Sequence, residues 1–472
     1  MTPLVRIRAL NEDPVRAERE FVLYWMTSFR RTGWNFALQR AVEEAARLKK
    51  PLVVLEALRV GYPGASDRLH TFVLEGMKEN EKRFAKTSAH YLPYVERSPG
   101  EGKGLLKALA ASACLLVGDD WPAFFVPQMQ AAAVKQVDVR FEVVDSNGLY
   151  PMHHTTRVFA TAHSFRTHLQ KVLPPHLLEF PLANPLARVK LPRLKQKQVS
   201  EFGLDVKVSE LPIDHSVAPV TLKGGSAAAE ARLKKFVVRD YAQQRNEPEV
   251  DGTTRLSPYL HFGHVSSHQV FSAVVGKNWS AKKLGKSIGG AKEGWWKLSP
   301  SAESFVDQLV TWRELAFNMT SHRPTEYREL DSLPGWARAT ITKHAKDPRP
   351  VLYSLEQLEK SQTHDRLWNA AMGQLRTEGW FHNYLRMLWG KKIYEWSPSA
   401  EDALKAMEYL MDKYSLDGRD PVSWSGYFWV LGRYDRAWGP ERKIFGKLRY
   451  MSSDATAKKL SVKKYIAKYG GS

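Results

Sequence analysis

Short apolar runs alternate with amphipathic stretches over the first 150 residues of the chain. Five runs are rich in β-branched and aromatic residues, which is typical of buried strands: FVLYWM (21–26), LVVLEAL (52–58), YLPYVE (91–96), CLLVGDD (114–120) and VRFEVVD (139–145). Between the first two lies NFALQRAVEEAARLKK (35–50), whose apolar positions recur at helical spacing. Strands that alternate with helices predict a Rossmann-like α/β domain with a parallel sheet. No GxGxxG motif follows the first run, so the usual dinucleotide-binding fingerprint is missing.

The pattern changes after residue 182. Pro, Lys, Gly and Ser dominate 183–228 without a clear period, which predicts a surface connection. Beyond it, apolar residues recur three and four positions apart in four long stretches, which predicts helices: 228–244, 303–319, 364–396 and 400–414. We therefore expect an α/β domain over 1–182, a linker over 183–228 and a mostly α-helical domain over 229–472.

Composition narrows the class of protein. The length of 472 residues favours two or three domains. No run of about 18 apolar residues predicts a membrane span, and the N-terminus has no apolar signal segment, so we expect a cytoplasmic protein. Cys114 is the single cysteine, which excludes an intramolecular disulfide and thiolate-built metal sites. We expect no metal site, no membrane partner and a monomer.

Charge and tryptophan content point to a partner. The net charge of +20 favours a polyanion, either a nucleic acid or an anionic membrane surface. The chain has 15 tryptophans, most of them in its C-terminal half, where arginines accompany them. Basic charge together with clustered Trp and Arg favours nucleic acid more strongly than charge alone.

Hydroxyl side chains gather in DGTTRLSPYLHFGHVS (251–266). Thr253, Thr254 and Ser257 stand with Arg255 just before Pro258, where a helix can begin. The unpaired N–H groups at a helix start suit a phosphate. An ordinary N-cap, with Ser257 before a proline at the first helical position, explains the same residues.

Tryptophans also follow a helical period. Trp389 and Trp396 are seven residues apart in HNYLRMLWGKKIYEW (382–396), two turns along one face, and Trp368 precedes them. Such a stripe is usually core packing, and that interpretation stays open beside a functional one.

These segments resemble a known family. TTRLSPYLHFGHVS closely resembles the flavin-pyrophosphate loop of photolyases and cryptochromes, and the resemblance runs from YWMTSFRRTGWNFALQRAVEEA to FGKLRYM. The chain most closely resembles the class II cyclobutane pyrimidine dimer photolyases. That resemblance implies an FAD-dependent carbon–carbon lyase that repairs pyrimidine dimers in double-stranded DNA with light. It also implies a helical C-terminal domain that binds FAD, and a second antenna chromophore of deazaflavin type, although no residue pattern identifies its site.

The resemblance assigns roles to individual residues. The implied FAD-binding residues are Tyr241, Thr253, Thr254, Arg255, Leu256, Ser257, Arg313, Asn383, Arg386, Met411 and Asp417. The implied electron relay has Trp389 nearest the flavin, Trp368 in the middle and Trp396 outermost. The implied contacts to the dimer are Gln308, Trp312, Met387 and Trp429. Arg436, Trp438 and Arg449 match the side chains that enter the DNA gap left by the flipped bases.

Three positions depart from the class II pattern. Gln308 stands where the family has a catalytic glutamate, and an amide cannot supply a titratable proton. Met411 replaces an asparagine set near the flavin, and Asn383, in WFHN, is more typical of other photolyase classes. Repair is the leading hypothesis. A cryptochrome-like photoreceptor without efficient repair is the alternative, and a light-independent DNA-binding protein is a third.

Overall fold

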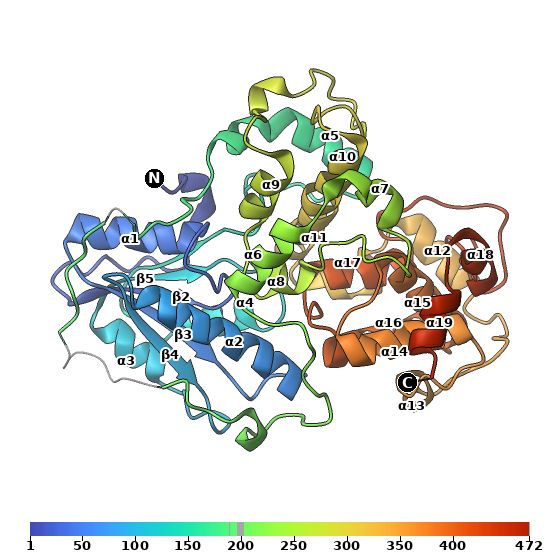
Figure 1. Ribbon diagram of the computed structural model, residues 1–472, viewed down its shortest axis with the longest axis horizontal. Helices are drawn as coiled ribbons and strands as arrows, with labels where there is room; N and C mark the ends of the chain where they lie inside the picture. Colours follow the sequence, from blue (N-terminus) through green and yellow to red (C-terminus); the bar gives the residue numbers. More distant parts are fainter. Residues whose placement is uncertain (188, 196–202, 472) are drawn as a thin grey trace. The chain divides into compact units, whose positions relative to one another are not determined.

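The computed structural model describes residues 1–187, 189–195 and 203–471 (Figure 1). It divides into two compact units. Unit 1 comprises 1–156, 172–236 and 255–282, and unit 2 comprises 157–171, 237–254 and 283–472. The predicted linker 183–228 falls within unit 1, apart from 188 and 196–202, which lie outside the described residues.

A six-stranded sheet forms the centre of unit 1. Its strands are β1 (Ile7–Ala9), β2 (Phe21–Met26), β3 (Leu52–Leu58), β4 (His90–Val95), β5 (Ala113–Asp119) and β6 (Phe141–Val144). They lie in the order β1-β6-β5-β2-β3-β4. Strands β2 to β6 pair in parallel, and β1 pairs with β6 in antiparallel orientation. The five predicted strands and their parallel arrangement are confirmed, whereas the three residues of β1 are too few to show a period.

Helices cover both faces of this sheet, which explains why its strands are continuous apolar runs. Every residue of β2 is buried. Phe21, Leu23 and Trp25 alternate along that strand and join one core with Leu109 and Ala133. The helices of unit 1 are α1 (Phe36–Leu48), α2 (Asp67–Phe84), α3 (Leu105–Ala111), α4 (Val126–Val134), α6 (Ser226–Lys235), α8 (Ser257–His261) and α9 (Ser267–Val275).

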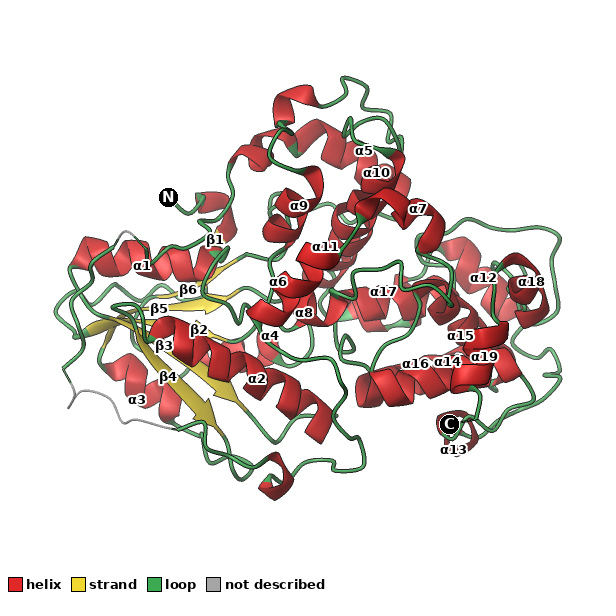
Figure 2. Ribbon diagram, in the orientation of Figure 1, coloured by secondary structure: helices red, strands yellow, loops and turns green. Residues whose placement is uncertain are grey.

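Unit 2 is helical where it is described (Figure 2). Its helices are α5 (Ala162–Val172), α7 (Tyr241–Gln244), α10 (Pro300–Val306), α11 (Arg313–His322), α12 (Gly335–Lys343), α13 (Leu355–Glu359), α14 (Arg366–Glu378), α15 (Asn383–Trp396), α16 (Ala400–Tyr414), α17 (Pro421–Val430), α18 (Ser453–Lys459) and α19 (Lys463–Tyr469). Helix α15 packs against α14, α16 and α17, and α17 packs against α11. The predicted combination of an α/β sheet and a helical remainder is confirmed.

The helix predicted over 364–396 is two helices. Asp365 caps α14 by accepting hydrogen bonds from the N–H groups of Leu367 and Trp368. Gly379, at a φ of 65°, ends α14 in the left-handed conformation that glycine adopts without strain. The chain then turns and starts α15 at Asn383. The apolar period continues across this turn, so periodicity alone does not show the break, whereas Gly379 and the helix expected over 382–396 agree with it.

The segment 303–319 is helical throughout, but its middle is wider than an α-helix. Residues Asp307–Trp312 form a π-helical segment between α10 and α11. Such segments are rare and frequently occur at functional sites. Among the described residues, no helix is both long and apolar enough to cross a bilayer.

Candidate functional site

The loop before α8 carries the hydroxyl groups predicted to hold a phosphate. The Oγ1 of Thr253 is buried and has no hydrogen-bond partner among the described residues. Arg255 adopts a φ of 49°, which is uncommon for a residue with a side chain and marks a sharp turn. Ser257 is the first residue of α8, and no side chain caps this helix. Ser257 therefore does not act as a simple N-cap of α8. The buried hydroxyl of Thr253 can still form a hydrogen bond with a ligand.

Tyr241 begins α7 in unit 2. Its ring packs edge-on against Phe305 at 5.1 Å between centroids, and the Arg245 guanidinium lies 5.5 Å from its ring centre. Burial raises the pKa of Tyr241, so its hydroxyl stays protonated at neutral pH.

Arg386 and Asp417 form the ion pair that the resemblance implies. Two parallel hydrogen bonds of 3.0 and 3.1 Å join the guanidinium on α15 to the carboxylate that follows α16. The Arg386 Nε donates to the carbonyl of Phe381 at 3.1 Å, which fixes the orientation of the guanidinium. Ser415 donates a further hydrogen bond to Asp417. This two-pronged geometry holds a cation at a defined place beside α15.

The other predicted flavin contacts differ in exposure. Met411 is buried on α16, and Arg313 is buried on α11 with its guanidinium 4.4 Å from the ring centre of Phe317. Asn383 is exposed at the first position of α15, and Leu256 is buried before α8.

The three predicted relay tryptophans form one continuous chain of ring contacts, stacked between Trp368 and Trp389 and edge-on between Trp368 and Trp396. Trp368 lies between the other two, with centroid distances of 6.3 Å to Trp389 and 5.6 Å to Trp396. The rings of Trp368 and Trp389 are parallel within 2°. The Trp368 indole N–H donates to the carbonyl of Trp389 at 3.0 Å, which locks the ring in place. The middle place predicted for Trp368 agrees with these contacts, and the order of the relay relative to the flavin stays a prediction.

All three rings are buried, Trp396 included. Tyr353 packs edge-on against Trp396 at 5.2 Å, and its hydroxyl is 2.7 Å from Nδ1 of the exposed His364. Trp396 thus reaches solvent through these two residues rather than directly. The core-packing interpretation is correct as a description of these tryptophans, and it is compatible with a relay.

The predicted dimer contacts Gln308 and Trp312 share the π-helical segment. They are four residues apart, which is close to one turn of this wider helix, so both side chains point to nearly the same side. Both are half-buried, and the Gln308 carboxamide makes no hydrogen bond to the described residues. Its donor and acceptor groups are available to a ligand.

A cavity of about 330 Å³ in unit 2 brings together several of the other predicted residues. Met387, Trp429, Trp438 and Arg449 line it. Tyr384, Arg442 and Lys459 line it as well and were not predicted, because single basic or aromatic residues carry no distinctive pattern. The walls combine flat apolar rings with cations, which suits bases attached to phosphates.

The three predicted DNA-contacting residues form one cluster around Trp438. The guanidinium groups of Arg436 and Arg449 lie 4.5 and 4.1 Å from its ring centre. Asp435 joins them by accepting hydrogen bonds from Arg449 and from the Trp438 indole. Burial opposes the ionisation of Asp435, but these hydrogen bonds outweigh it and lower the pKa of the carboxyl. Asp435 is not among the residues predicted from the sequence. Its contact with Arg449 fixes the orientation of the guanidinium, which is therefore ion-paired in this structure.

In unit 1, the position where a nucleotide phosphate could bind beyond β2 is already filled. The backbone N–H groups of Thr27, Ser28 and Phe29 all donate to one oxygen of Asp119 at 2.7–2.9 Å. Three successive N–H groups after a strand make an anion site, and here the chain supplies its own carboxylate. This arrangement agrees with the missing glycine-rich fingerprint.

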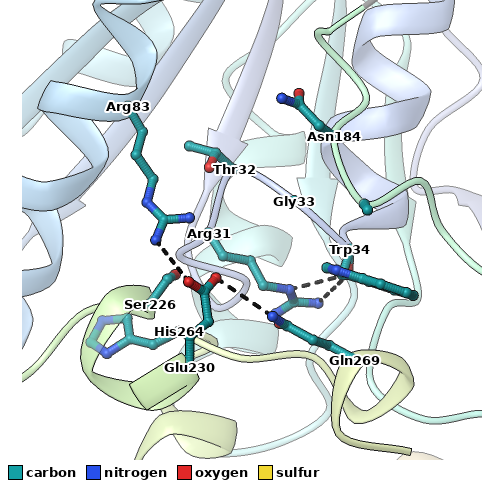
Figure 3. Close-up of a pocket in the computed structure, with 11 residues that line it drawn as sticks. Arg31, Thr32, Gly33, Trp34, Arg83, Asn184, Ser226, Glu230, His264 and Gln269 are labelled. Carbon is teal, nitrogen blue, oxygen red and sulfur yellow. Dashed lines mark hydrogen bonds and ion pairs between the residues drawn. The ribbon is translucent and has the colours of Figure 1, made fainter. Parts of the chain in front are cut away.

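A second cavity, of about 120 Å³, lies in unit 1 (Figure 3). Its polar groups are largely paired, since Arg83 and Gln269 both contact Glu230 while Arg31 donates to the carbonyl of Trp34. Burial lowers the pKa of His264 to about 3, so this residue is neutral. The cavity is smaller than the roughly 300–1,000 Å³ that drug-sized ligands occupy, so it does not supply a site for the predicted antenna.

Several known proteins that share one name are similar to this chain over nearly its whole length. The chain is 30% identical over 470 residues to a deoxyribodipyrimidine photo-lyase of Methanothermobacter thermautotrophicus, covering 99% of this chain and 98% of that protein. It is 34% identical over 465 residues to one of Oryza sativa, covering 94% and 87%. A bacterial class III photolyase from Agrobacterium tumefaciens has a similar fold, with a TM-score of 0.69 at 16% identity, covering 96% and 86%. No family model matches the chain.

Proposed function

Because the chain belongs to the deoxyribodipyrimidine photo-lyase family, we propose that it repairs cyclobutane pyrimidine dimers in double-stranded DNA with light and reduced FAD. The cavity lined by Met387, Trp429, Trp438 and Arg449 is the observation that carries this proposal beyond the family name, since its apolar rings and cations suit flipped bases and their phosphates. Loss of dimers from an illuminated oligonucleotide tests it. Monomeric state, cytoplasmic location and a deazaflavin antenna stay predictions.

The residues of the helical unit fit a flavin. Thr253 has a buried hydroxyl and Trp389 a buried indole N–H, and neither has a partner among the described residues. A buried donor without an acceptor is costly, and a bound cofactor with acceptor atoms removes that cost. We propose that FAD is bound by the eleven residues, from Tyr241 to Asp417, that the family resemblance assigns to it. When bound, reduced FAD supplies the light-driven electron that opens the dimer.

Arg386 and Asp417 set the charge at this site. A guanidinium favours an anionic neighbour, whereas a carboxylate alone would oppose it. The pair holds Arg386 in a fixed orientation, so its positive charge is present before any ligand binds. Met411 offers no hydrogen bond comparable to that of the family's asparagine, so Arg386 is proposed to contribute more to the stability of the reduced state.

Gln308 is proposed to bind the dimer without supplying a proton. The carboxamide can donate to a pyrimidine carbonyl, but it remains neutral and unchanged throughout. Trp312 on the same side of the π-helical segment and Trp429 on the cavity wall provide apolar surfaces for flipped bases, and Met387 provides a third.

Replacement of Gln308 by glutamate is expected to raise the repair yield per absorbed photon by roughly twofold, well below the roughly 10²–10⁴-fold that general acid–base groups add to reaction rates, because a yield per photon cannot exceed 1. The yield is measured with chemically reduced enzyme and a dimer-containing oligonucleotide. Gln308→Leu serves as the matched control and should lower the yield, since it removes the hydrogen bond altogether. A glutamate variant no better than the wild type would show that the site does not use an acid.

Replacement of Arg449 by alanine is expected to weaken binding to dimer-containing DNA and to reduce the salt slope of the binding constant by about 1, the effect of losing one phosphate contact. Arg449 lies beside Trp438 and lines the cavity, which places its guanidinium where a strand would pass. Titrations at several salt concentrations measure the slope. Asp435→Asn is a useful companion, because it frees Arg449 and should not reduce the slope. An unchanged slope in Arg449→Ala would exclude the phosphate contact.

A further inference from the structure

A lysine is buried in the helical unit where neither the relay nor the DNA cluster requires one. Lys391 lies on α15 and is 1% exposed. Its ammonium group donates to the carbonyl of Val430 at 2.5 Å. No carboxylate of the described residues lies within ion-pair distance of it. The Asp435 carboxylate acts on this ammonium only from beyond ion-pair distance, so burial of the charge is only partly compensated.

The ammonium of Lys391 lies behind the wall of the cavity. It is 5.3 Å from the ring centre of Trp429, which lines the 330 Å³ cavity. The Arg449 guanidinium is 5.5 Å from the centre of the same ring. Lys391 itself does not line the cavity but contacts Trp429, which does, so the buried cation acts on the cavity from within the low-dielectric interior.

We propose that Lys391, placed beside Trp429, stabilises negative charge on a dimer bound in this cavity. The inference rests on the proposed repair function. A glutamate at position 308 would help to stabilise negative charge on the dimer, but this chain has Gln308 there. Lys391 is proposed to supply part of that stabilisation. A fixed cation close to developing charge is the arrangement that stabilises such charge most effectively.

The reaction stays balanced without any transfer from Lys391. The cofactor would supply one electron and take it back, and the two C–C bonds that join the pyrimidines in the cyclobutane ring break in between. Lys391 remains protonated, and no bond forms or breaks at its nitrogen. Its effect is to lower the energy of the dimer while the dimer carries the extra electron.

The charge of Lys391 depends on pH within the working range. Burial lowers the pKa of Lys391 to about 7, while Asp435 raises it and Arg449 lowers it further. The ammonium form is present below this pKa and is lost as the pH rises through it. Phosphates of bound DNA favour the ammonium form, so the transition in the complex lies at or above this value. The support from Lys391 should therefore fade on the alkaline side.

Lys391→Met tests the proposal, because methionine fills most of the same space but removes the charge, together with the hydrogen bond to the Val430 carbonyl. The repair yield of the chemically reduced holoenzyme is measured from pH 6 to 9 on a dimer-containing oligonucleotide. The variant is expected to repair at least about threefold less efficiently than the wild type near pH 6.5. Its yield should no longer depend on pH in this range, whereas that of the wild type should fall as the pH rises.

Lys392→Met is the matched control. Lys392 is also largely buried on α15, but it is paired with Glu395 at 2.8 Å and does not contact Trp429. Its variant should keep the wild-type pH profile. The dissociation constant for dimer DNA should be similar for both variants and the wild type, because neither lysine reaches the surface.

The outcomes separate the two proposals. Wild-type protein that does not repair at any pH overturns the proposed function. Wild-type protein that repairs, together with a Lys391→Met variant of equal yield or an unchanged pH slope, overturns the role of Lys391 and leaves repair standing. A yield loss in Lys391→Met that is matched by weaker DNA binding and is independent of pH also overturns it, since that pattern indicates a packing role only.

Discussion

Trp389→Phe is expected to slow the photoreduction of oxidised FAD by roughly tenfold or more, equivalent to at least about 1.4 kcal/mol of barrier. Trp389 is the first ring of the stack, parallel to Trp368 at 6.3 Å. Phenylalanine fills most of the space but is much harder to oxidise, so the path loses its first step. Transient absorption, or steady illumination with an external reductant, measures the rate.

Repair by enzyme that has been reduced chemically should be nearly unchanged in the same variant, because the relay is not used once the cofactor is reduced. Trp424→Phe is the control, since Trp424 is a buried tryptophan on α17 that lies outside the stack. It should photoreduce at the wild-type rate. Equal rates for Trp389→Phe and the wild type would remove Trp389 from the relay.

Arg386→Gln should destabilise the helical unit by about 2–4 kcal/mol and reduce its FAD content. The change leaves the Asp417 carboxylate, whose side chain is 7% exposed, without its cation, and a buried carboxylate without a partner is strongly destabilising. It also removes the positive charge that is proposed to favour the anionic reduced cofactor. Denaturation of the holoprotein followed by circular dichroism measures the first effect, and the absorbance of released flavin measures the second.

The double variant Arg386→Gln/Asp417→Asn separates the two roles of this pair. Two amides can hydrogen-bond to each other without charge, so most of the lost stability should return. The preference for reduced flavin should not return, because no cation is restored. A double variant with the redox behaviour of the wild type would show that Arg386 acts through packing alone.

The sheet was predictable from the sequence because its strands are buried on both faces and therefore read as apolar runs. The relay order was predictable only through the family resemblance, since periodicity places Trp389 and Trp396 on one face but says nothing of Trp368 across the bundle. The π-helical segment that contains Gln308 and Trp312 does not change the spacing of apolar residues, because it widens only a short part of a continuous helix.

The burial of Lys391 is the feature that the sequence pattern predicts least well. Two adjacent lysines in WGKKIYEW are typical of a solvated helix face, yet both are largely buried. Lys391 is buried against α17, which follows later in the chain and supplies Val430 and Trp429 as its neighbours. Asp435 escaped prediction for the same reason, since only the fold brings it to Arg449 and Trp438.

Light-dependent repair by the reduced protein is the most direct test of the whole account. A duplex oligonucleotide with one cyclobutane pyrimidine dimer is incubated with chemically reduced holoprotein, under blue light and in darkness, and intact dimer is counted by chromatography. We predict loss of dimer and recovery of the two pyrimidines in the light only. Dimer that persists under illumination, with FAD bound and fully reduced, would contradict repair and favour a photoreceptor that kept the cofactor and the relay.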